Sequence, residues 1–192
     1  MAQAFVLGNG VSRQAVDLNS LRKLGRIYGC NALYREFQPN VLVATDTPIS
    51  EEIQRSGYAL HHNFYTRRPQ EGRGARRIPE QYWKYSSGPA AVGLAADSGF
   101  ARIYLLGFDL GPDQNNLFNN VYAGTEFYRD TGAQPTYTGN WINQLTEVFA
   151  KFPATEFVRV TGSTTAAIDR FKLVPNLKHM SIADFLTQLN TG

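Results

Sequence analysis

Short apolar runs alternate with segments of helical character through most of this chain of 192 residues. The runs at residues 4–8, 41–45 and 102–106 (AFVLG, VLVAT and RIYLL) have the composition of buried strands. Strands separated by helices form right-handed βαβ units, in which neighbouring strands are parallel. We therefore predict an α/β fold: a single Rossmann-like domain over residues 1–192, with a mainly parallel sheet and helices on both faces.

Periodicity and turn residues set the expected boundaries of these elements. We predict strands at residues 4–8, 26–29, 41–45, 58–61, 102–106 and 157–160. We predict one helix that Ser12 or Asp17 caps and that ends near residue 24, and further helices at residues 32–37, 48–56, 87–99, 140–152 and 182–189. Two long segments show no clear period, namely a basic and aromatic loop at 62–85 and a Gly- and Asn-rich segment at 111–136.

The composition is that of an ordinary globular protein, with 43% hydrophobic and 18% charged residues. No apolar run approaches the roughly 20 residues of a membrane span. The N-terminus lacks the basic and apolar regions of a signal peptide. The one cysteine, Cys30, cannot form an internal disulfide. We therefore expect a cytoplasmic protein without a membrane span.

Positive charge is concentrated in one short stretch, although the net charge of +3 is too small to indicate nucleic-acid binding. Five arginines lie within eleven positions of the loop at 62–85: Arg67, Arg68, Arg73, Arg76 and Arg77. Such a loop could contact a phosphate, an anionic glycan or an acidic partner. It could equally be a solvated loop that its charge keeps soluble.

In parallel α/β sheets the ligand lies outside the carboxyl ends of the strands. Gly8, Asn9 and Gly10 follow the first strand, and glycines there let backbone N–H groups approach a phosphate. A dinucleotide fingerprint would need a third glycine at position 13, which is Arg13, and an acid about 20 residues further on, which is absent. An NAD or FAD enzyme is therefore not expected.

Polar residues follow other predicted strands or open a predicted helix. They are Asn31, Asp46, Gly107 and Asp109 after strands, and Ser86, Ser87 and Gly88 before the helix at 87–99. An Asn can contact a base or sugar edge, an Asp can accept from a ribose hydroxyl or hold a metal, and a helix start can bind an anion. Each of these residues could instead be an ordinary cap or turn.

Two blocks, VLGNGVSRQAVDLNSLRKLGRIYGCNALY and SSGPAAVGLAADSGFARIYLLGFDL, resemble the bacterial lipooligosaccharide sialyltransferases, and AIDRFKLVPNL resembles their C-terminal stretch. The resemblance implies transfer of a sugar from a nucleotide sugar, with a CMP-type donor favoured, to a glycan or other hydroxyl acceptor. It implies that Gly8, Asn9 and Gly10 line the phosphate and sugar, that Asn31 faces the cytosine or ribose, that Ser86, Ser87 and Gly88 meet the donor, and that Gly107 and Asp109 lie near the ribose and base. The segment 111–136 would be a lid that excludes water.

The chain departs from that family at the reacting centre. The family's catalytic His has no counterpart, and the matching position is Tyr137. Lys84 stands where the family has an Arg, Tyr122 is the substitute for a phosphate-binding tyrosine, and Asp46 replaces a sugar-contacting Asn. We therefore take Tyr137 or His62 as the candidate base, and Lys84 and Tyr122 as candidate phosphate partners. This interpretation requires no cofactor and no metal.

A second resemblance is to the 6-hydroxymethylpterin diphosphokinase-like family, through PNVLVATD and SGFARIYLLGFDL. It implies that Asp46 and Asp109 hold Mg²⁺ beside a nucleoside triphosphate. A third interpretation is a non-catalytic nucleotide-binding or assembly protein on the glycosyltransferase scaffold. All three interpretations are compatible with a homo-oligomer.

Overall fold

The computed structural model describes residues 2–192 and contains one eight-stranded sheet. The strands are β1 (Gln3–Leu7), β2 (Arg26–Cys30), β3 (Val41–Val43), β4 (Phe64–Thr66), β5 (Arg76–Arg77), β6 (Arg102–Leu106), β7 (Glu156–Thr161) and β8 (Leu177–Ser181). Every pair of neighbouring strands is parallel, and the order across the sheet is β5-β4-β3-β2-β1-β6-β7-β8. The predicted α/β, Rossmann-like fold is confirmed.

Four α-helices and six short 3-10 helices connect the strands. The α-helices are α1 (Thr47–Arg55), α2 (Ser87–Asp97), α3 (Gly139–Lys151) and α4 (Ile182–Thr191). The 3-10 helices are η1 (Val11–Ala15), η2 (Leu18–Lys23), η3 (Asn31–Arg35), η4 (Tyr58–Leu60), η5 (Glu80–Tyr82) and η6 (Asp169–Leu173). None of the described helices is both long enough and apolar enough to cross a bilayer.

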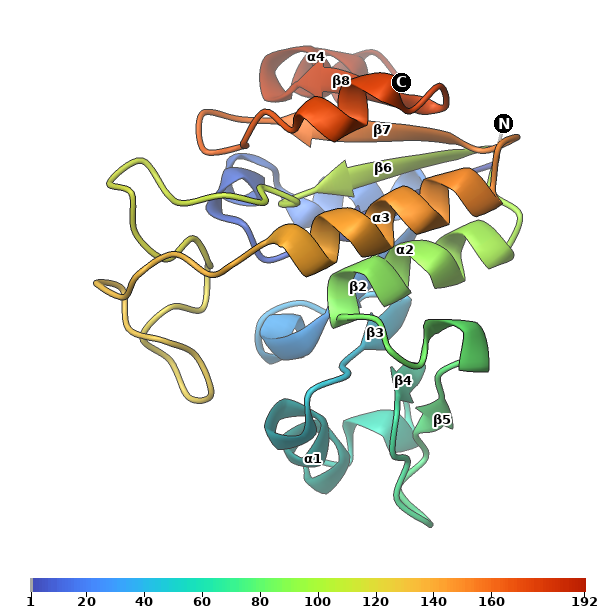
Figure 1. Cartoon of the computed structure of the whole chain (residues 1–192). Coiled ribbons are helices and arrows are strands. Elements are labelled where there is room, and N and C mark those ends of the chain that lie inside the picture. The colour runs from blue at the N-terminus through green and yellow to red at the C-terminus, as the bar shows by residue number, and fades with distance from the viewer. Residues whose placement is uncertain (1) are drawn as a thin grey trace.

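The strand order creates a switch point between β1 and β6. The chain builds β1 to β5 outward in one direction and then returns to place β6 on the other side of β1. The connections that follow β1 and β6 therefore lead to opposite faces of the sheet, and a ligand crevice is expected at the carboxyl ends of the strands at such a switch point. The segment 111–136 projects from this same end of the sheet (Figure 1).

Helices cover both faces of the sheet, because alternate side chains of each strand point to opposite sides. Ala4 and Val6 of β1 belong to the apolar cluster that contains α2 and α3, which lie side by side in Figure 1. Phe5 and Leu7 belong to the opposite cluster, which contains α1, α4 and the 3-10 helices η2 and η3. Buried apolar surface on both faces holds the site-bearing loops on a rigid frame.

Three boundary predictions are corrected by the structure. The predicted strand at 58–61 is the 3-10 helix η4, which follows Gly57 in a left-handed conformation (φ +79°). The predicted loop at 62–85 contains β4, β5 and η5. The first predicted helix is two 3-10 helices, of which Asp17 caps the second by accepting the Asn19 N–H. With β8, which was not predicted either, the sheet has eight strands instead of about six.

A truncation in the core tests the packing of the sheet's central strand. Phe5 has no exposed surface, stacks on Tyr104 and meets the edge of Phe185. We expect Phe5→Ala to lower the free energy of unfolding by about 3–5 kcal/mol, because it leaves a cavity between strand and helix. The control Leu173→Ala removes a side chain that is 84% exposed and should cost less than about 0.5 kcal/mol. Urea unfolding measures both, and an equal effect of the two changes would contradict this packing.

Candidate functional site

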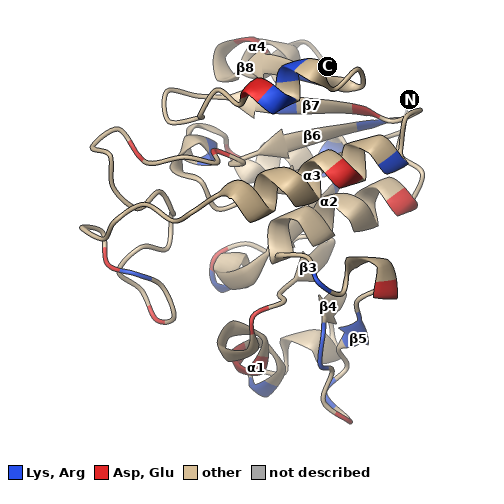
Figure 2. Cartoon of the chain, in the orientation of Figure 1, with Lys and Arg blue, Asp and Glu red and all other residues tan. Residues whose placement is uncertain are grey.

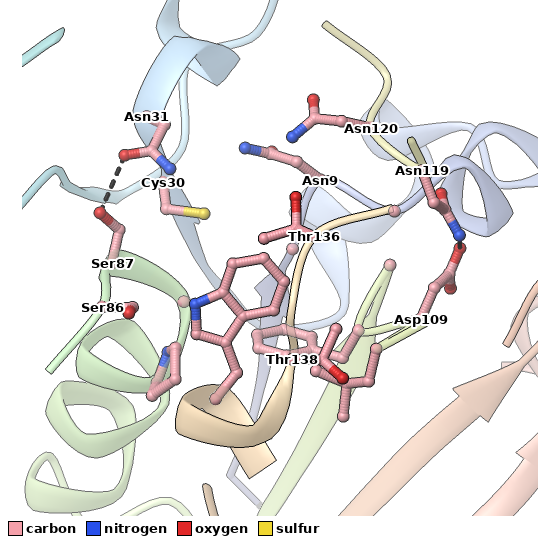
Figure 3. Close-up of a pocket in the computed structure, with 18 of the residues that line it drawn as sticks. Asn9, Cys30, Asn31, Ser86, Ser87, Asp109, Asn119, Asn120, Thr136 and Thr138 are labelled. Carbon is pink, nitrogen blue, oxygen red and sulfur yellow. Dashed lines mark hydrogen bonds between the residues drawn. The ribbon is translucent and has the colours of Figure 1, made fainter. Parts of the chain in front are cut away.

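A cavity of about 170 Å³ lies at the switch point, and we call it the switch-point pocket. It is lined by the loops that follow β1, β2, β3 and β6, by the first turns of α2 and α3, and by parts of the segment 111–136 (Figure 3). Ten of the predicted site residues line it: Gly8, Asn9, Gly10, Asn31, Asp46, Ser86, Ser87, Gly88, Gly107 and Asp109. The residues that follow the strands therefore lie together at one edge of the sheet, as expected where the carboxyl ends of parallel strands are adjacent.

The loops after β1 and β6 cross in direct backbone contact. The Gly8 N–H donates to the Leu106 carbonyl at 2.7 Å, and the Gly10 N–H donates to the Gly107 carbonyl at 2.8 Å. A Cβ on Gly8 would lie 2.7 Å from the Gly107 carbonyl oxygen, and Gly107 itself has φ +74°. The glycines of Gly8-Asn9-Gly10 are therefore required for this crossing, whether or not a phosphate also approaches them.

Asp109 joins the loops around the pocket through five hydrogen bonds. Its carboxylate accepts from the Ser12 N–H at 3.1 Å, from the Ser12 hydroxyl, from Asn119 Nδ2 at 3.1 Å, and from the Thr164 and Thr165 hydroxyls at 2.8 and 3.2 Å. Only 3% of the residue is exposed. A carboxylate has about four lone-pair sites, so Asp109 has no acceptor capacity left for a ligand.

A buried arginine supports the same loop from below. Arg159 donates to the Phe108 carbonyl at 2.9 Å, to the Asp109 carbonyl at 3.1 Å and to the Ala166 carbonyl at 2.8 Å. Burial lowers the pKa of its guanidinium to about 10, and the nearby Asp109 carboxylate opposes that shift. Arg159 therefore stays charged at neutral pH and fixes three carbonyl oxygens, of which the Asp109 carbonyl also accepts the Ala166 N–H at 2.8 Å.

The side chain of Asn31 is fixed through its oxygen, and its amide N–H groups make no hydrogen bond with another described residue. The Ser87 hydroxyl accepts the Thr45 N–H at 2.9 Å and donates to Asn31 Oδ1 at 2.8 Å (Figure 3). Because the oxygen is occupied, the Nδ2 group of Asn31 remains as the donor toward the pocket. The backbone of Asn31 has φ +56°, a conformation that Asn tolerates better than most residues.

Asn9 has an amide without a partner among the described residues. Its Oδ1 atom is buried and makes no hydrogen bond, while its backbone carbonyl accepts the Val121 N–H at 2.8 Å. Leaving a buried acceptor unsatisfied costs about 1–3 kcal/mol. As it is placed, the Oδ1 atom is closed off from the cavity, and Figure 3 shows the amide nitrogen of Asn9 directed toward the pocket, so a ligand donor would reach the oxygen only after the amide turns.

Two helices begin at the pocket without capping side chains. Ser86 precedes α2 and Thr138 precedes α3, and neither side chain makes a capping hydrogen bond. The first turns of both helices lack acidic residues. The helix dipole places partial positive charge at each N-terminus, so an anion is favoured where the two ends meet the pocket. Among the described lining residues there is no Lys, Arg or His, so the helix ends are the pocket's source of positive potential.

Four predicted residues do not reach the switch-point pocket. Tyr137 is 79% exposed and lines none of the cavity wall. His62 hydrogen-bonds Gln38 and contacts the Tyr58 ring beside a different cavity. Neither Tyr137 nor His62 therefore lies where it could act as the predicted base in the switch-point pocket.

The two predicted phosphate partners also lie elsewhere. Lys84 lines a neighbouring cleft. Tyr122 is buried, accepts from Arg13 at 2.9 Å and donates to Glu36 at 2.9 Å. Burial raises the pKa of the Tyr122 hydroxyl, which keeps it protonated. Tyr122 therefore secures the segment 111–136 to the sheet and does not face a ligand.

The sequence analysis expected the segment 111–136 at the donor site but named no single lining residue in it or at the start of α3. These lining residues are Phe118, Asn119, Asn120, Thr136, Thr138 and Trp141. The Asn-rich run in the segment 111–136 was the one available signal. Asn119 Oδ1 accepts the Val11 N–H at 2.9 Å, so this segment is tied to the loop after β1. Cys30 also lines the pocket, but burial raises the pKa of its thiol to about 12 and leaves it protonated and unreactive.

An isosteric change at Asp109 tests its role as the joint between loops. Asp109→Asn replaces one acceptor oxygen by a donor that faces N–H and O–H groups, so we expect a loss of about 2–4 kcal/mol in unfolding free energy. The control Asp130→Asn changes an exposed carboxylate and should cost less than about 0.5 kcal/mol. Equal stability of Asp109→Asn and the parent protein, measured by urea unfolding, would refute this role.

Comparison with known proteins adds no further assignment. No family model, curated protein or solved structure matches the chain significantly. Functional conclusions therefore depend on the geometry and chemistry of the pocket itself.

Proposed function

We propose that the switch-point pocket binds the nucleotide of a nucleotide-sugar donor, with a CMP-type donor favoured, and that the protein transfers the sugar to a glycan or other hydroxyl acceptor. The observation that carries this proposal is the unpartnered amide of Asn9 beside the free Nδ2 group of Asn31, in a cavity where two helices begin. A nucleotide supplies matching groups for all three features.

The amides suit the nucleoside part of such a donor. Cytosine presents an amino donor and two acceptors, and ribose hydroxyls both donate and accept. The Asn31 Nδ2 group would donate to a base or ribose acceptor. The Asn9 amide would donate through Nδ2 as it is placed, or would accept from an amino or hydroxyl group after a turn that brings Oδ1 to the cavity. The phosphate would lie at the uncapped N-termini of α2 and α3.

The size of the cavity indicates that it would enclose only part of the nucleotide sugar. Its volume of about 170 Å³ is below the ~300–1,000 Å³ of pockets that enclose a complete drug-sized ligand. The nucleoside would therefore enter the cavity, while the sugar would extend over its rim. Asp46 lines the pocket and is exposed, and its carboxylate forms no hydrogen bond or ion pair with another described residue. Its carboxylate would be the group that accepts a proton from the acceptor hydroxyl.

The side chains that could serve as metal ligands do not fit the Mg²⁺-dependent alternative. That mechanism needs Asp46 and Asp109 as metal ligands, but hydrogen bonds from four residues occupy Asp109. No group of three His, Cys, Asp or Glu side chains suited to a metal occurs within residues 2–192. We therefore favour a nucleotide sugar over a metal-bound triphosphate. A non-catalytic nucleotide-binding protein remains the rival, and the test at Asp46 separates the two.

Nucleotide binding is tested by removing the two amides. We expect CMP without metal to raise the melting temperature, since a ligand stabilises by RT ln(1 + [L]/Kd). Asn9→Ala and Asn31→Ala should each weaken CMP binding about tenfold or more, because each removes about 1.4 kcal/mol of hydrogen bonding. The control Asn190→Ala, an exposed residue of α4, should leave the CMP shift unchanged. If both site variants keep the parent's CMP affinity, the nucleotide assignment is wrong.

Catalysis is tested at Asp46. With CMP-sialic acid as donor and lactose as acceptor, we expect Asp46→Asn to lower kcat about a hundredfold or more while CMP affinity stays the same. The control Glu51→Gln changes a carboxylate of α1, the helix that Asp46 precedes, and Glu51 does not line the pocket. CMP release measures turnover. An undiminished rate in Asp46→Asn would remove this residue's role, and CMP binding without turnover in the parent protein would favour the non-catalytic rival.

A further inference from the structure

A second cavity lies beside the switch-point pocket, between residues 77–85 and the first turns of α3. Its volume is about 1240 Å³, which exceeds the ~1,000 Å³ upper end of ordinary small-ligand sites. Trp83 lines it, so we call it the Trp83 cleft. An extended, multi-ring ligand would fit this space better than a single small molecule.

The Trp83 cleft and the switch-point pocket share a boundary. Lys84 and Tyr85 line the cleft, and the next residue, Ser86, lines the pocket. The Ser86 N–H donates to Gln144 Oε1 at 2.8 Å, and Gln144 lines the cleft. A ligand that lies along the cleft would therefore end where the nucleotide would begin.

The lining of the cleft alternates fixed donors and acceptors. Gln144 uses its oxygen for Ser86, which leaves its Nε2 group as a donor. Glu147 Oε2 accepts from the Tyr85 hydroxyl at 2.6 Å, which leaves Oε1 as an acceptor. Asn143 uses its oxygen for Arg170, so its Nδ2 group also remains a donor. A ligand rich in hydroxyl groups satisfies such a surface, because each hydroxyl both donates and accepts.

An aromatic ring and two cations complete the surface. The Arg77 guanidinium lies 4.6 Å from the centre of the Trp83 ring. This stacking holds a ring that combines an apolar body with an N–H donor. Arg77 and Lys84 form no ion pair with a described acidic residue, and Figure 2 shows basic residues on β5 and directly after β4. Glu80 and Glu147 also line the cleft, so its two cations and two carboxylates balance, and the lining favours a ligand by its hydroxyl groups and not by its charge.

We propose that the Trp83 cleft binds an oligosaccharide and presents its terminal hydroxyl to the switch-point pocket. The saccharide's role as acceptor rests on the proposed function, whereas its binding does not. Sugar rings offer apolar C–H faces for the Trp83 ring and hydroxyls for the fixed amides and Glu147. The Trp83 cleft would thus hold the saccharide that accepts the sugar, and the switch-point pocket would hold the nucleotide sugar, with Ser86 between the two sites.

The two tryptophans of the chain allow the two sites to be observed separately. Trp83 lines the cleft and Trp141 lines the pocket. Trp141→Phe leaves Trp83 as the fluorescent reporter, and Trp83→Phe leaves Trp141. We expect lactose, sialyllactose or maltotriose to change Trp83 emission saturably, and CMP to change Trp141 emission. The saccharides should leave Trp141 emission much less affected.

Isothermal titration with the parent chain and two arginine variants gives the matched comparison. Arg77→Ala should weaken binding of the responding saccharide about fivefold or more, because it removes the cation stacked on Trp83. The control Arg73→Ala removes an exposed arginine that lines neither cavity. No Trp83 response to any of the three saccharides at millimolar concentration would overturn the proposal, as would equal affinity in Arg77→Ala and the parent. A Trp141 response to CMP in that case would leave the proposed function intact.

Discussion

One buried carboxylate determines where the parts of the site lie. Asp109 accepts hydrogen bonds from the loop after β1, from the segment 111–136 and from the loop after β7, while its own loop follows β6. Three parts of the chain that are distant in sequence are thereby fixed around a single residue. The adjacent Arg159 binds the carbonyls of the same loop. An unpaired buried charge would be costly, so the donors around Asp109 and the cation near it must be present together.

This arrangement explains why the pocket itself carries so little charge. The strongly charged groups, Asp109 and Arg159, are satisfied by the protein and shape the loops without meeting the cavity as free charges. What remains for a ligand is a set of amides and two helix ends, which are oriented before anything binds. Such preorganised dipoles need no rearrangement when a ligand arrives. Their geometry suits a ligand with one anionic group and several hydrogen-bonding groups, and Asp46 adds one unpaired carboxylate to the lining.

Sequence reasoning was most successful where the physical signal is local. The run at 102–106 became β6 with the same bounds, and the rule for carboxyl ends brought together Asn9, Asn31 and Asp109. The polar residues after strands were therefore correctly located, but their roles depend on partners far along the chain. No sequence pattern near Asp109 predicts that Thr164 and Thr165 donate hydrogen bonds to it.

The remaining errors have physical causes too. β5 has two residues, both arginine, and β8 is a mostly exposed edge strand, so neither has the apolar pattern of a buried strand. Tyr137 and Lys84 were selected by their positions in the family resemblance, and His62 and Tyr122 as substitutes of a suitable residue type. Packing of the long segments decides where all four side chains lie. The nucleotide sugar, its transfer and the saccharide acceptor stay predictions that binding and turnover must test.

The most direct test of the account follows individual amides during titration with CMP. In a spectrum of ¹⁵N-labelled protein, the side-chain resonances of Asn9 and Asn31 and the backbone resonances of Ser87 and Gly88 should shift together along one binding curve. Resonances of the β8 edge, remote from the pocket, should stay in place. If CMP leaves the four pocket residues unmoved, or shifts only residues outside the switch-point pocket, the central claim is contradicted.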